Sequence, residues 1–535
     1  MWVMTRFMAG LTLIAFNPCR AGVPPAIERL IPAGGQRGTT VDVKLVGKPG
    51  DGDLRVVTEN DTIVFTLNEK KDSASVAISE TARPGTHWLR FCNADGATEL
   101  KPFIVGMIPE VTESEPNARI VEANSVGLPS VTVNGVLETS GDVDTFAVAL
   151  NKGQTMVCAM QAKVVIGSPM DAVLQIADAR GTVMAQNDDD ISFDPRIAFT
   201  APEDGKWFVR TFAFPATPNS TISFAGGADY VYRLTLTTAA VVEHTEPAVR
   251  FEQENETSLA VFGWNIQTPT ASINRDQNAM MEPYALPYLV PRSDVPSIVE
   301  SQLTAERMLT LPVAVTGRVT SADDVAFLLN ATMSRMLSLS VRSRSIGSML
   351  DPVLIVEGPD GKVVNESDDI SGDNCDAELH LTMPVDGQYR VIIRDRFQNY
   401  GDRCFYVLRC EETHAAVTAT FASTAGMLKP ESTLEIPITF GRKHGFSEPV
   451  NVRVEGLPDG MTFECPRSEK DGATSTSVIL KISGSTTEPF QGPIRIVAES
   501  AESKDLQPVT FTTADETQVS EYWLTVPKSA ANGSE

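Results

Sequence analysis

One stretch of this chain is written twice, 180 positions apart. GSPMDAVLQIADARGTVMAQNDDD begins at Gly167, and GSMLDPVLIVEGPDGKVVNESDDI begins at Gly347. The likeness extends on both sides, because VNGVLETSGDVDTFAV matches VTGRVTSADDVAFLL upstream and DYVYRLTL matches CFYVLR downstream. A repeat of this length is typical of duplicated domains, since solenoid units run to roughly 20–50 residues. The sequence therefore predicts two copies of one fold, over residues 110–238 and 295–412.

Apolar and polar residues alternate along most of the chain. Two of the clearest runs are Val41, Val43 and Leu45, and Leu434, Ile436, Ile438 and Phe440. A period of two places such residues on one face of a β-strand, and turn clusters such as LPDG, GPDG and VDG separate the runs. Sustained helical periodicity is nearly absent. We therefore expect an all-β, multi-domain array of β-sandwiches.

The segments outside the two copies also have the pattern of β-modules. PAIERLIPAGGQRGTTVDVKLVG, which starts at Pro25, opens a predicted β-domain over residues 23–108. A fainter version of it, PAVRFEQENETSLAVFGWN, precedes the second copy, where residues 245–292 leave room only for a partial β-module or a linker. Residues 415–529 have their own alternation and are predicted to form a separate immunoglobulin-like sandwich.

The N-terminus has the pattern of a secretory signal. Arg6 supplies a positive start, an apolar run follows, and small residues precede a cleavage point after Ala21. No later stretch has the length of a membrane helix. We expect residues 1–21 to be a signal peptide and the mature chain to be secreted, on the cell surface or periplasmic, without a transmembrane segment.

The charge of the chain argues against one class of partner. The 69 acidic residues outnumber the 44 basic ones, for a formal net charge of −25. A nucleic-acid-binding protein needs basic patches that replace the counterions of phosphates, and none stands out. The acidity is consistent either with solubility or with affinity for a divalent cation.

Cleavage after Ala21 leaves six scattered cysteines. They form no C-x-x-C pair, so the sequence indicates neither a zinc site nor a redox motif. Cys404 and Cys410 are too far apart on one strand to bridge each other. Cys375 could reach one of them if its loop folds back over that strand. The other cysteines are expected to be isolated buried thiols.

A series of motifs in the first copy resembles a known family. The order is ESEPN, GDVDTF, the GSPMDAVLQIAD strand, a polar NDDD turn, EDGKWFVR and YVYRLTL. It resembles the bacterial pre-peptidase C-terminal (PPC) domain, a jelly-roll-like β-sandwich found in many exported peptidases. PAGGQRGTTVDVKLVG looks like the start of a TIG-type, immunoglobulin-like domain. The resemblance implies an accessory role in binding, spacing or export, and some members, in clostridial collagenases, bind collagen and calcium.

Five oxygen-bearing side chains of the first copy form a candidate calcium site. Glu113, Glu115 and Asn117 occupy alternate positions, so an extended segment directs them to one side, and Asp142 and Asp144 do the same on a strand edge. Carboxylate and amide oxygens are the ligands that Ca²⁺ prefers. The positions match the E-x-E-x-N segment and the following acidic residues of the collagenase-type members. We therefore expect a Ca²⁺ site here.

The second copy is predicted to lack this site. An alignment of the two copies places Ser293, Val295 and Ser297 where the first copy has its E-x-E-x-N residues, and Val325 opposite Asp144. Most of the oxygen ligands are then missing. We expect calcium to stabilise the first copy alone.

The aspartate clusters that close the duplicated stretch allow two interpretations. Asp188, Asp189 and Asp190, and likewise Asp368 and Asp369, lack the spacing of an EF-hand loop. The favoured interpretation is a solvated loop whose side chains bond the local backbone, and the alternative is a minor cation role.

No motif of an enzyme assembles in this chain. G-x-S-x-G, H-E-x-x-H and a phosphate-binding glycine loop are all missing from the sequence. The histidines are dispersed over separate modules: His87, His244, His380, His414 and His444. We expect a non-catalytic protein.

The favoured function is that of an exported multi-domain binding or scaffold protein, whose partner is an unknown extracellular or periplasmic protein or polysaccharide. One alternative is a glycan- or matrix-binding adhesin with an aromatic platform of Trp207, Phe212, Phe214 and Trp264, although Trp207 fits the core better. Two others are an accessory protein of a secreted peptidase system and an enzyme whose site lies between domains.

Overall fold

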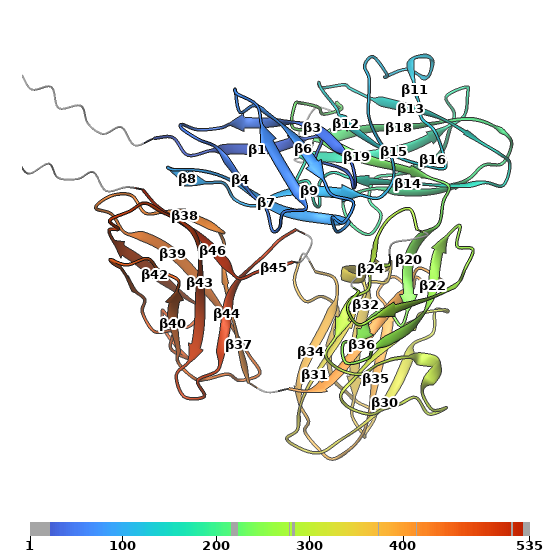
Figure 1. Cartoon of the computed structure of the whole chain (residues 1–535). Helices are drawn as coiled ribbons and strands as arrows, with labels where there is room; N and C mark the ends of the chain where they lie inside the picture. The colour runs from blue at the N-terminus through green and yellow to red at the C-terminus, as the bar shows by residue number, and fades with distance from the viewer. Residues whose placement is uncertain are drawn as a thin grey trace, which may run out of the picture.

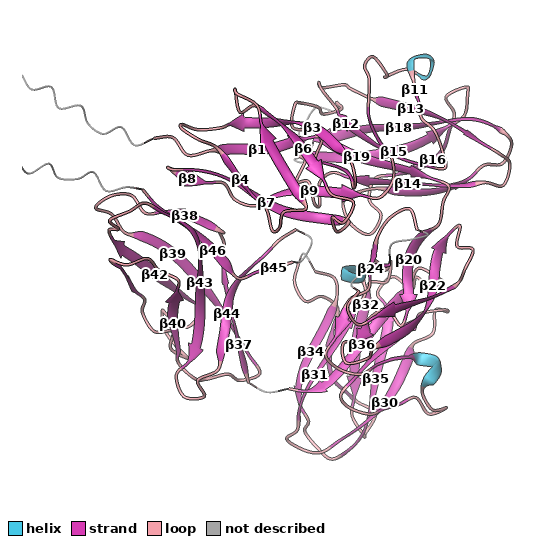
Figure 2. Cartoon of the chain, in the orientation of Figure 1, coloured by secondary structure: helices cyan, strands magenta, loops and turns pink. Residues whose placement is uncertain are grey.

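The computed structural model shows a chain built almost wholly of β-strands (Figures 1 and 2). It describes residues 22–215, 223–277, 279–280, 284–372, 374–413, 415–514 and 517–527. The helical elements among these are short 3₁₀ turns: η1 (Ile120–Glu122), η2 (Glu300–Gln302) and η3 (Arg344–Ile346). The predicted all-β, multi-sandwich class is confirmed. The predicted signal peptide over residues 1–21 lies outside the described residues.

The chain starts with two facing sheets that we call the N-terminal sandwich. Their strand orders are β1-β3-β6-β5 and β2-β9-β7-β4, with β8 paired to β7. The core between them contains Val76, Phe91 and Phe103, which are fully buried. The strands are β1 (Ala26–Ile31), β2 (Gly34–Gln36), β3 (Thr40–Lys48), β4 (Arg55–Val57), β5 (Ile63–Leu67), β6 (Ser73–Ile78), β7 (Gly85–Asn93), β8 (Gly96–Ala97) and β9 (Lys101–Gly106).

The next ten strands form a second sandwich, called here the first repeat. Its five-stranded sheets have the orders β10-β12-β19-β14-β17 and β11-β13-β18-β15-β16. The strands are β10 (Glu110–Thr112), β11 (Asn124–Ser125), β12 (Ser130–Val136), β13 (Asp144–Leu150), β14 (Thr155–Gln161), β15 (Met170–Ala177), β16 (Val183–Asn187), β17 (Arg196–Thr200), β18 (Gly205–Pro215) and β19 (Val231–Thr237).

The second repeat has the same topology. Its sheets have the orders β27-β29-β36-β31-β34 and β28-β30-β35-β32-β33, so each strand has a counterpart in the first repeat. The strands are β27 (Ser297–Val299), β28 (Met308–Leu309), β29 (Val313–Arg318), β30 (Val325–Ala331), β31 (Met336–Arg342), β32 (Pro352–Glu357), β33 (Val363–Ser367), β34 (Ala377–Thr382), β35 (Gly387–Asp395) and β36 (Phe405–Glu412).

Equivalent core positions show that the two repeats also share a register. Phe146 pairs with Val209 in the first repeat, and Phe327 pairs with Val391 in the second. All four side chains are fully buried. The internal repetition of the sequence is therefore a repetition of tertiary structure as well.

A smaller set of strands, the middle module, lies between the repeats. It has a three-stranded sheet, β20-β22-β23, and two short pairs, β21-β26 and β24-β25. Leu259, Val261 and Ile273 form a small core there. The strands are β20 (Val241–Glu246), β21 (Arg250–Phe251), β22 (Glu256–Trp264), β23 (Thr270–Asn274), β24 (Ala279–Met280), β25 (Tyr288–Leu289) and β26 (Arg292–Ser293).

The last strands form the C-terminal sandwich. Its main path is β38-β46-β43-β44-β37-β39-β42-β41, with β40 on β43 and β45 on β44. The strands are β37 (Ala416–Phe421), β38 (Ala425–Met427), β39 (Leu434–Lys443), β40 (Val450–Glu455), β41 (Met461–Glu464), β42 (Ser477–Gly484), β43 (Phe490–Ser500), β44 (Leu506–Thr512), β45 (Gln518–Val519) and β46 (Glu521–Val526).

The N-terminal sandwich contacts the C-terminal sandwich, so the two ends of the described chain lie side by side (Figure 1). The Glu99 carboxylate accepts hydrogen bonds from the Thr424 amide at 2.9 Å, the Thr424 hydroxyl at 2.6 Å and the Ser423 hydroxyl at 2.6 Å. The Arg90 guanidinium donates to the Thr424 carbonyl at 3.2 Å. Burial by itself would raise the pKa of Glu99, but the bonds from Ser423 and Thr424 and the charge of Arg90 outweigh it and lower that pKa.

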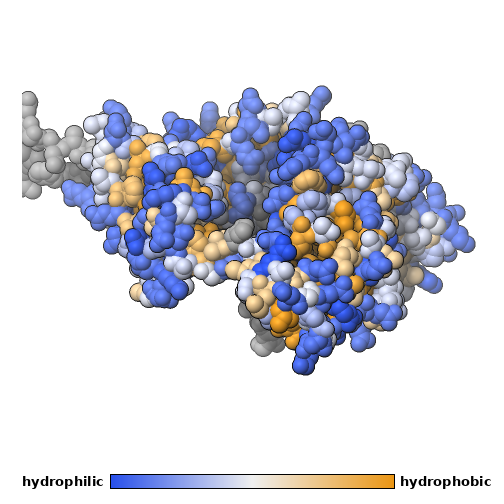
Figure 3. Space-filling model, turned by 90° about the horizontal axis from the view of Figure 1, so that it is seen from below, coloured by the Kyte–Doolittle hydropathy of each residue, from blue (hydrophilic) through white to orange (hydrophobic). Residues whose placement is uncertain are grey.

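Large apolar side chains are exposed in several modules. Examples are Phe193, Met333, Phe397 and Leu506. Seen from below, the surface mixes hydrophobic groups with a larger hydrophilic area (Figure 3). Scattered exposure of this kind is normal for a folded protein. Within the described residues, no helix is long and apolar enough to cross a membrane.

The six cysteines within the described residues are free thiols. Cys404 and Cys410 are buried in the second repeat, and Cys375 is half-buried and unbridged. The link from Cys375 to one of them, which the sequence left open, does not form in the structure. The side chains of Cys404 and Cys410 belong to the core of the sandwich. Burial also raises the pKa of the Cys410 thiol, which makes it a poor nucleophile.

We predict that Glu99→Gln weakens the contact between the two terminal sandwiches, by about 1–3 kcal/mol at pH 7, because it removes a charged acceptor of three hydrogen bonds. A carboxyl whose pKa is lowered by folding stabilises the fold above its ordinary pKa, and this contribution is lost as the pH falls through the lowered value. Denaturant unfolding of both proteins at pH 7 and pH 3 should show the difference at pH 7 and a smaller difference at pH 3.

The matched control for Glu99→Gln is Asp53→Asn, whose carboxyl group is fully exposed in the same sandwich. We expect it to change the free energy of unfolding by less than about 0.5 kcal/mol. Equal effects of both variants at pH 7 would contradict the assignment of Glu99 to the contact.

We also predict that every cysteine after residue 22 reacts with iodoacetamide in denaturant without a reductant. Mass spectrometry should find Cys375, Cys404 and Cys410 fully alkylated, since the structure pairs none of them. A disulfide-linked peptide that contains Cys375 would restore the prediction made from the sequence.

Candidate metal site

The site begins where β10 ends, at Glu113. The Glu113 amide donates to the Asn134 carbonyl at 3.0 Å, which keeps the chain beside β12. The next residue of β12, Gly135, lies opposite Tyr232 of β19, and a Cβ on Gly135 would collide with the tyrosine ring. Because Gly135 has no Cβ, the Tyr232 ring can lie over this position of strand β12. Its hydroxyl oxygen lies 3.0 Å from Glu113 Oε2 and 2.6 Å from Asp144 Oδ2, so its single hydrogen can be donated to either carboxyl group.

Three of the predicted residues join Glu113 in one cluster. Asp144, the first residue of β13, and Asn117 are fully buried, whereas Glu115 is exposed. Asn117 donates its backbone amide to Glu115 Oε2 at 2.9 Å and its side-chain amide to Glu113 Oε2 at 3.3 Å. One oxygen from each of Glu113, Glu115 and Asp144 lies within 4.8 Å of the others.

Two buried oxygens of the cluster have no hydrogen-bond donor. They are Oδ1 of Asn117 and Oδ1 of Asp144. A buried polar atom without a partner costs roughly 1–3 kcal/mol, so native structures rarely leave one without a reason. Here two such atoms lie on side chains that also contact the neighbouring carboxyl groups.

The electrostatics of the cluster disfavour its negative charge. Burial raises the pKa of Glu113, and burial together with the neighbouring Glu113 carboxyl raises the pKa of Asp144. Burial also raises the pKa of Glu115, and the charge of Asp142 adds to this. A bound cation would reverse both effects, because it offers compensating charge where water is excluded.

The distances fit a calcium ion. Ca²⁺ binds oxygens at about 2.3–2.6 Å, so two ligands on opposite sides of it are about 5 Å apart. Glu113, Glu115 and Asp144 meet this limit, and the free oxygen of Asn117 is a fourth candidate ligand. A site with so many carboxylates favours a hard cation over a softer transition metal.

Asp142, the fifth predicted ligand, has a different role in the structure. Its Oδ2 accepts the Glu138 amide at 2.7 Å and its Oδ1 accepts the Val143 amide at 2.9 Å. Both oxygens therefore stabilise the turn before β13. The structure brings four of the five predicted side chains together and leaves Asp142 at the edge of the group.

A cavity of about 230 Å³ opens beside the cluster. Glu113, Glu115 and Glu138 line it on the first repeat, and Ile31 and Pro32 of the N-terminal sandwich line the other side. Glu138 and Tyr232 are not among the residues that the sequence predicted for this site. A signal for Tyr232 existed, because the closing strand of the repeat has a tyrosine in both copies.

The predicted alignment of the second copy is wrong in part. Strand β27, which starts at Ser297, is the counterpart of β10, which starts at Glu110, so Ser297 does not correspond to Asn117. The equivalent of Glu113 is Glu300, which follows β27 as Glu113 follows β10. The error arose because the sequence alignment matched Pro296 with Pro116, whereas its counterpart is Pro109: the carbonyls of Pro109 and Pro296 accept the equivalent amides of Thr132 and Ala314. The placement of Val325 opposite Asp144 agrees with the pairing of β13 and β30.

The aspartate cluster of the first repeat lies against the second repeat. Arg403 of the second repeat donates to Asp190 at 2.9 Å and also pairs with Glu243 of the middle module. Arg196 pairs with Asp190 at 2.6 Å, and both guanidinium groups lie over the Trp264 ring. The solvated-loop interpretation is therefore wrong for Asp190, whose side chain is only 8% exposed.

We predict that Asp190→Asn lowers the free energy of unfolding by about 1–3 kcal/mol, because two arginines lose a shared charged partner. Asp188→Asn, two residues earlier and exposed, should change it by less than about 0.5 kcal/mol. Denaturant unfolding of the full chain checks both values, and equal effects would show that Asp190 is not part of the contact.

The predicted aromatic platform does not form. Trp207 is 3% exposed and belongs to the core of the first repeat, as its pattern indicated, and Phe212 is buried as well. Phe214 is partly exposed, whereas Trp264 lies under two arginines in the contact described above. These four side chains therefore share no exposed face.

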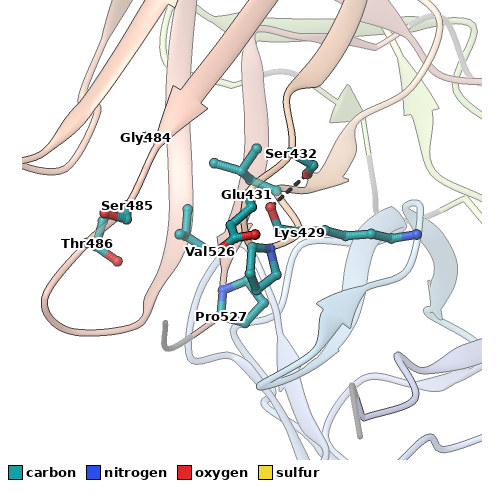
Figure 4. A pocket seen from close by; sticks show the side chains of 10 residues that line it. Lys429, Glu431, Ser432, Gly484, Ser485, Thr486, Val526 and Pro527 are labelled. Carbon is teal, nitrogen blue, oxygen red and sulfur yellow. Dashed lines mark hydrogen bonds between the residues drawn. The ribbon is translucent and has the colours of Figure 1, made fainter. Parts of the chain in front are cut away.

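A larger cavity, of about 440 Å³, lies in the C-terminal sandwich (Figure 4). Lys429 and Glu431 are the charged residues that line it, and the Ser432 hydroxyl donates to the Lys429 carbonyl at 2.7 Å. Ser485 and Thr486 face it from the loop after β42. This lining brings together neither paired carboxylates nor a serine with a histidine, so it offers no recognisable chemistry.

The comparisons with known proteins place the chain only in part. No family model matches it. A protein of Deinococcus radiodurans described as a probable subtilase-type serine protease is 28% identical over 170 residues, which are 30% of this chain and 22% of that protein. The chain therefore matches less than a quarter of that relative's length.

A solved structure of the M60 catalytic domain with the CBM51-1 and CBM51-2 domains of Clostridium perfringens ZmpB aligns with 77% of this chain and 56% of that chain. The TM-score is 0.16 and the identity 7%, so this likeness supports no functional argument. The resemblance to the PPC family remains a prediction.

Proposed function

We propose that this chain is an exported, non-catalytic, multi-domain binding or scaffold protein whose first repeat is a PPC-like sandwich stabilised by Ca²⁺. Glu113, Glu115, Asn117 and Asp144 would hold the ion. The observation that carries the proposal is the pair of buried, unpaired oxygens of Asn117 and Asp144 beside three carboxyl groups within 4.8 Å.

Calcium here would have a structural role. The cluster joins the segment after β10 to the start of β13, which belong to different sheets of the first repeat. A cation bound between them would tie the two sheets together at one end. It would also offset the burial and the repulsion from Glu113 that together raise the pKa of Asp144. Binding to the folded form alone stabilises it by mass action.

The surroundings of the histidines support a non-catalytic role. His244 is stacked between Phe262 and Phe405, with ring centroids 4.6 and 4.1 Å away, and burial lowers its pKa to about 3. His380 and His444 face each other at 4.0 Å between the second repeat and the C-terminal sandwich. None of these three is paired with a serine or cysteine nucleophile within the described part of the chain.

A role beside a secreted peptidase is a second candidate. The partial match to a protein described as a probable subtilase-type serine protease favours it, and the predicted signal peptide agrees with it. In either role the partner is an extracellular or periplasmic protein or polysaccharide. A pull-down from the secreted fraction with the full chain, with and without calcium, would identify it.

Calorimetric titration and thermal melting test the calcium site. We expect one Ca²⁺ per chain and a melting transition that rises by several degrees, since free calcium at 100 times Kd adds about 2.7 kcal/mol. Glu113→Gln combined with Asp144→Asn should abolish this response. It should not destabilise the chelator-treated protein, because it removes two buried like charges.

Asp142→Asn is the matched control for the calcium site. Its carboxyl group bonds the backbone of the turn, so this variant should keep the calcium response even if its melting point falls. A response that survives Glu113→Gln with Asp144→Asn, or that is lost in Asp142→Asn alone, would contradict the proposed ligand set.

A further inference from the structure

The second repeat retains one glutamate of the acidic cluster and the tyrosine that contacts it. Glu300 stands where the first repeat has Glu113, and Tyr406 stands where it has Tyr232. The Tyr406 hydroxyl donates to Glu300 Oε2 at 2.8 Å, compared with 3.0 Å between Tyr232 and Glu113. A Cβ on Gly317 would collide with the Tyr406 ring, as one on Gly135 would with Tyr232. The glycine, tyrosine and glutamate therefore form one motif that both repeats keep.

The two repeats differ in how they compensate this buried glutamate. Val325 replaces Asp144, which removes one negative charge. Arg307 forms an ion pair with Glu300, and its guanidinium lies 4.9 Å above the Phe327 ring. Phe327 is the core residue equivalent to Phe146, so this arginine lies over the same edge of the sandwich as the cluster of the first repeat.

The strand register identifies the residue of the first repeat that corresponds to Arg307. Strand β28 begins at Met308 beside Leu328, and strand β11 pairs Ser125 with Ala147, so Arg307 corresponds to Asn124. In the first repeat the Asn124 side chain bonds the backbone of Ser114 at 2.7 and 2.8 Å. Ser114 lies between Glu113 and Glu115. The same strand position thus supports the acidic segment in one repeat and supplies a cation in the other.

We propose that this place in the second repeat is a cation site that the chain fills with its own Arg307 guanidinium. The inference deepens the proposed function, on whose calcium site in the first repeat it rests. Three carboxyl groups meet in the first repeat, whereas one carboxyl group meets one guanidinium in the second. The second repeat should therefore keep its fold in chelator, and the substitutions that separate the repeats should convert one site into the other.

The first test compares Arg307→Met and Arg307→Lys in the full chain by hydrogen exchange. Methionine keeps the apolar stem over Phe327 but removes the charge, whereas lysine keeps the charge. We expect peptides over residues 297–318 to exchange about fivefold faster in Arg307→Met, as for a loss near 1 kcal/mol. Arg307→Lys should retain at least half of the protection. Both results should be the same in calcium and in chelator.

Arg335→Met is the matched control. Arg335 pairs with Glu412 on the surface of the same repeat. Its loss should leave exchange over residues 297–318 unchanged, since exposed ion pairs contribute little. Equal exchange in wild type and Arg307→Met, or equal acceleration in Arg307→Met and Arg307→Lys, would overturn the proposal.

The second test is conversion of the site. Arg307→Asn with Val325→Asp and Gln302→Glu restores the Asn124, Asp144 and Glu115 of the first repeat beside Glu300. We expect this triple variant to exchange slowly over residues 297–318 with 5 mM CaCl₂ and faster in chelator, on the order of threefold. Exchange that calcium does not change in a folded triple variant would overturn the proposal, and if the variant does not fold, the Arg307→Met and Arg307→Lys pair decides.

Failure of this inference can be told apart from failure of the calcium site. The calcium site is contradicted if calcium does not change hydrogen exchange of wild-type peptides over residues 110–136. The inference is contradicted if the charge at position 307 does not change hydrogen exchange over residues 297–318, and this measurement needs no metal. The two readouts come from different repeats of the same protein.

Discussion

Compensation of buried carboxylates is the constraint on which the arrangement of this chain depends. A buried carboxylate is unstable unless a cation or several hydrogen bonds accompany it. Glu110 meets this need with a bidentate pair to the fully buried Arg233 at 2.7 and 2.8 Å, at the junction with the N-terminal sandwich. Glu99 does so with Thr424 and Ser423. In both cases the groups that compensate the carboxylate lie on a segment that is more than 100 positions away from it in sequence.

The two repeats compensate a partly buried glutamate in two different ways. Both repeats direct a glutamate toward a tyrosine hydroxyl across a glycine, and this geometry buries part of the carboxylate. The second repeat compensates its glutamate with an arginine. The first repeat instead places more carboxyl groups beside its glutamate and leaves two oxygens without hydrogen-bond donors. In the second repeat the charge of the glutamate is compensated by a group of the protein itself. The carboxyl groups of the first repeat need a proton or a cation from solution to balance their charge, and the proposed calcium site rests on this need.

The sequence predicted the strand content and the duplication well, because period-two alternation and repeated segments are local signals. It also predicted that Glu113, Glu115, Asn117 and Asp144 lie close together, as the structure has them. It did not predict that Asp142 bonds the backbone of its own turn, because alternation tells which side of a strand a residue faces but not which backbone amides lie nearby. It also missed the link between Asp190 and Arg403, whose partners are 213 positions apart and share no local pattern.

The sequence by itself determined that this chain is an acidic series of β-sandwiches with two related copies, because composition, turns and alternation act over a few residues at a time. Only the tertiary structure decided that Glu300 is the counterpart of Glu113 and that Arg307 compensates it. It likewise decided that the first and last sandwiches touch and that the cysteines stay unpaired. These facts depend on strand register and on the packing of distant segments, which no local pattern specifies.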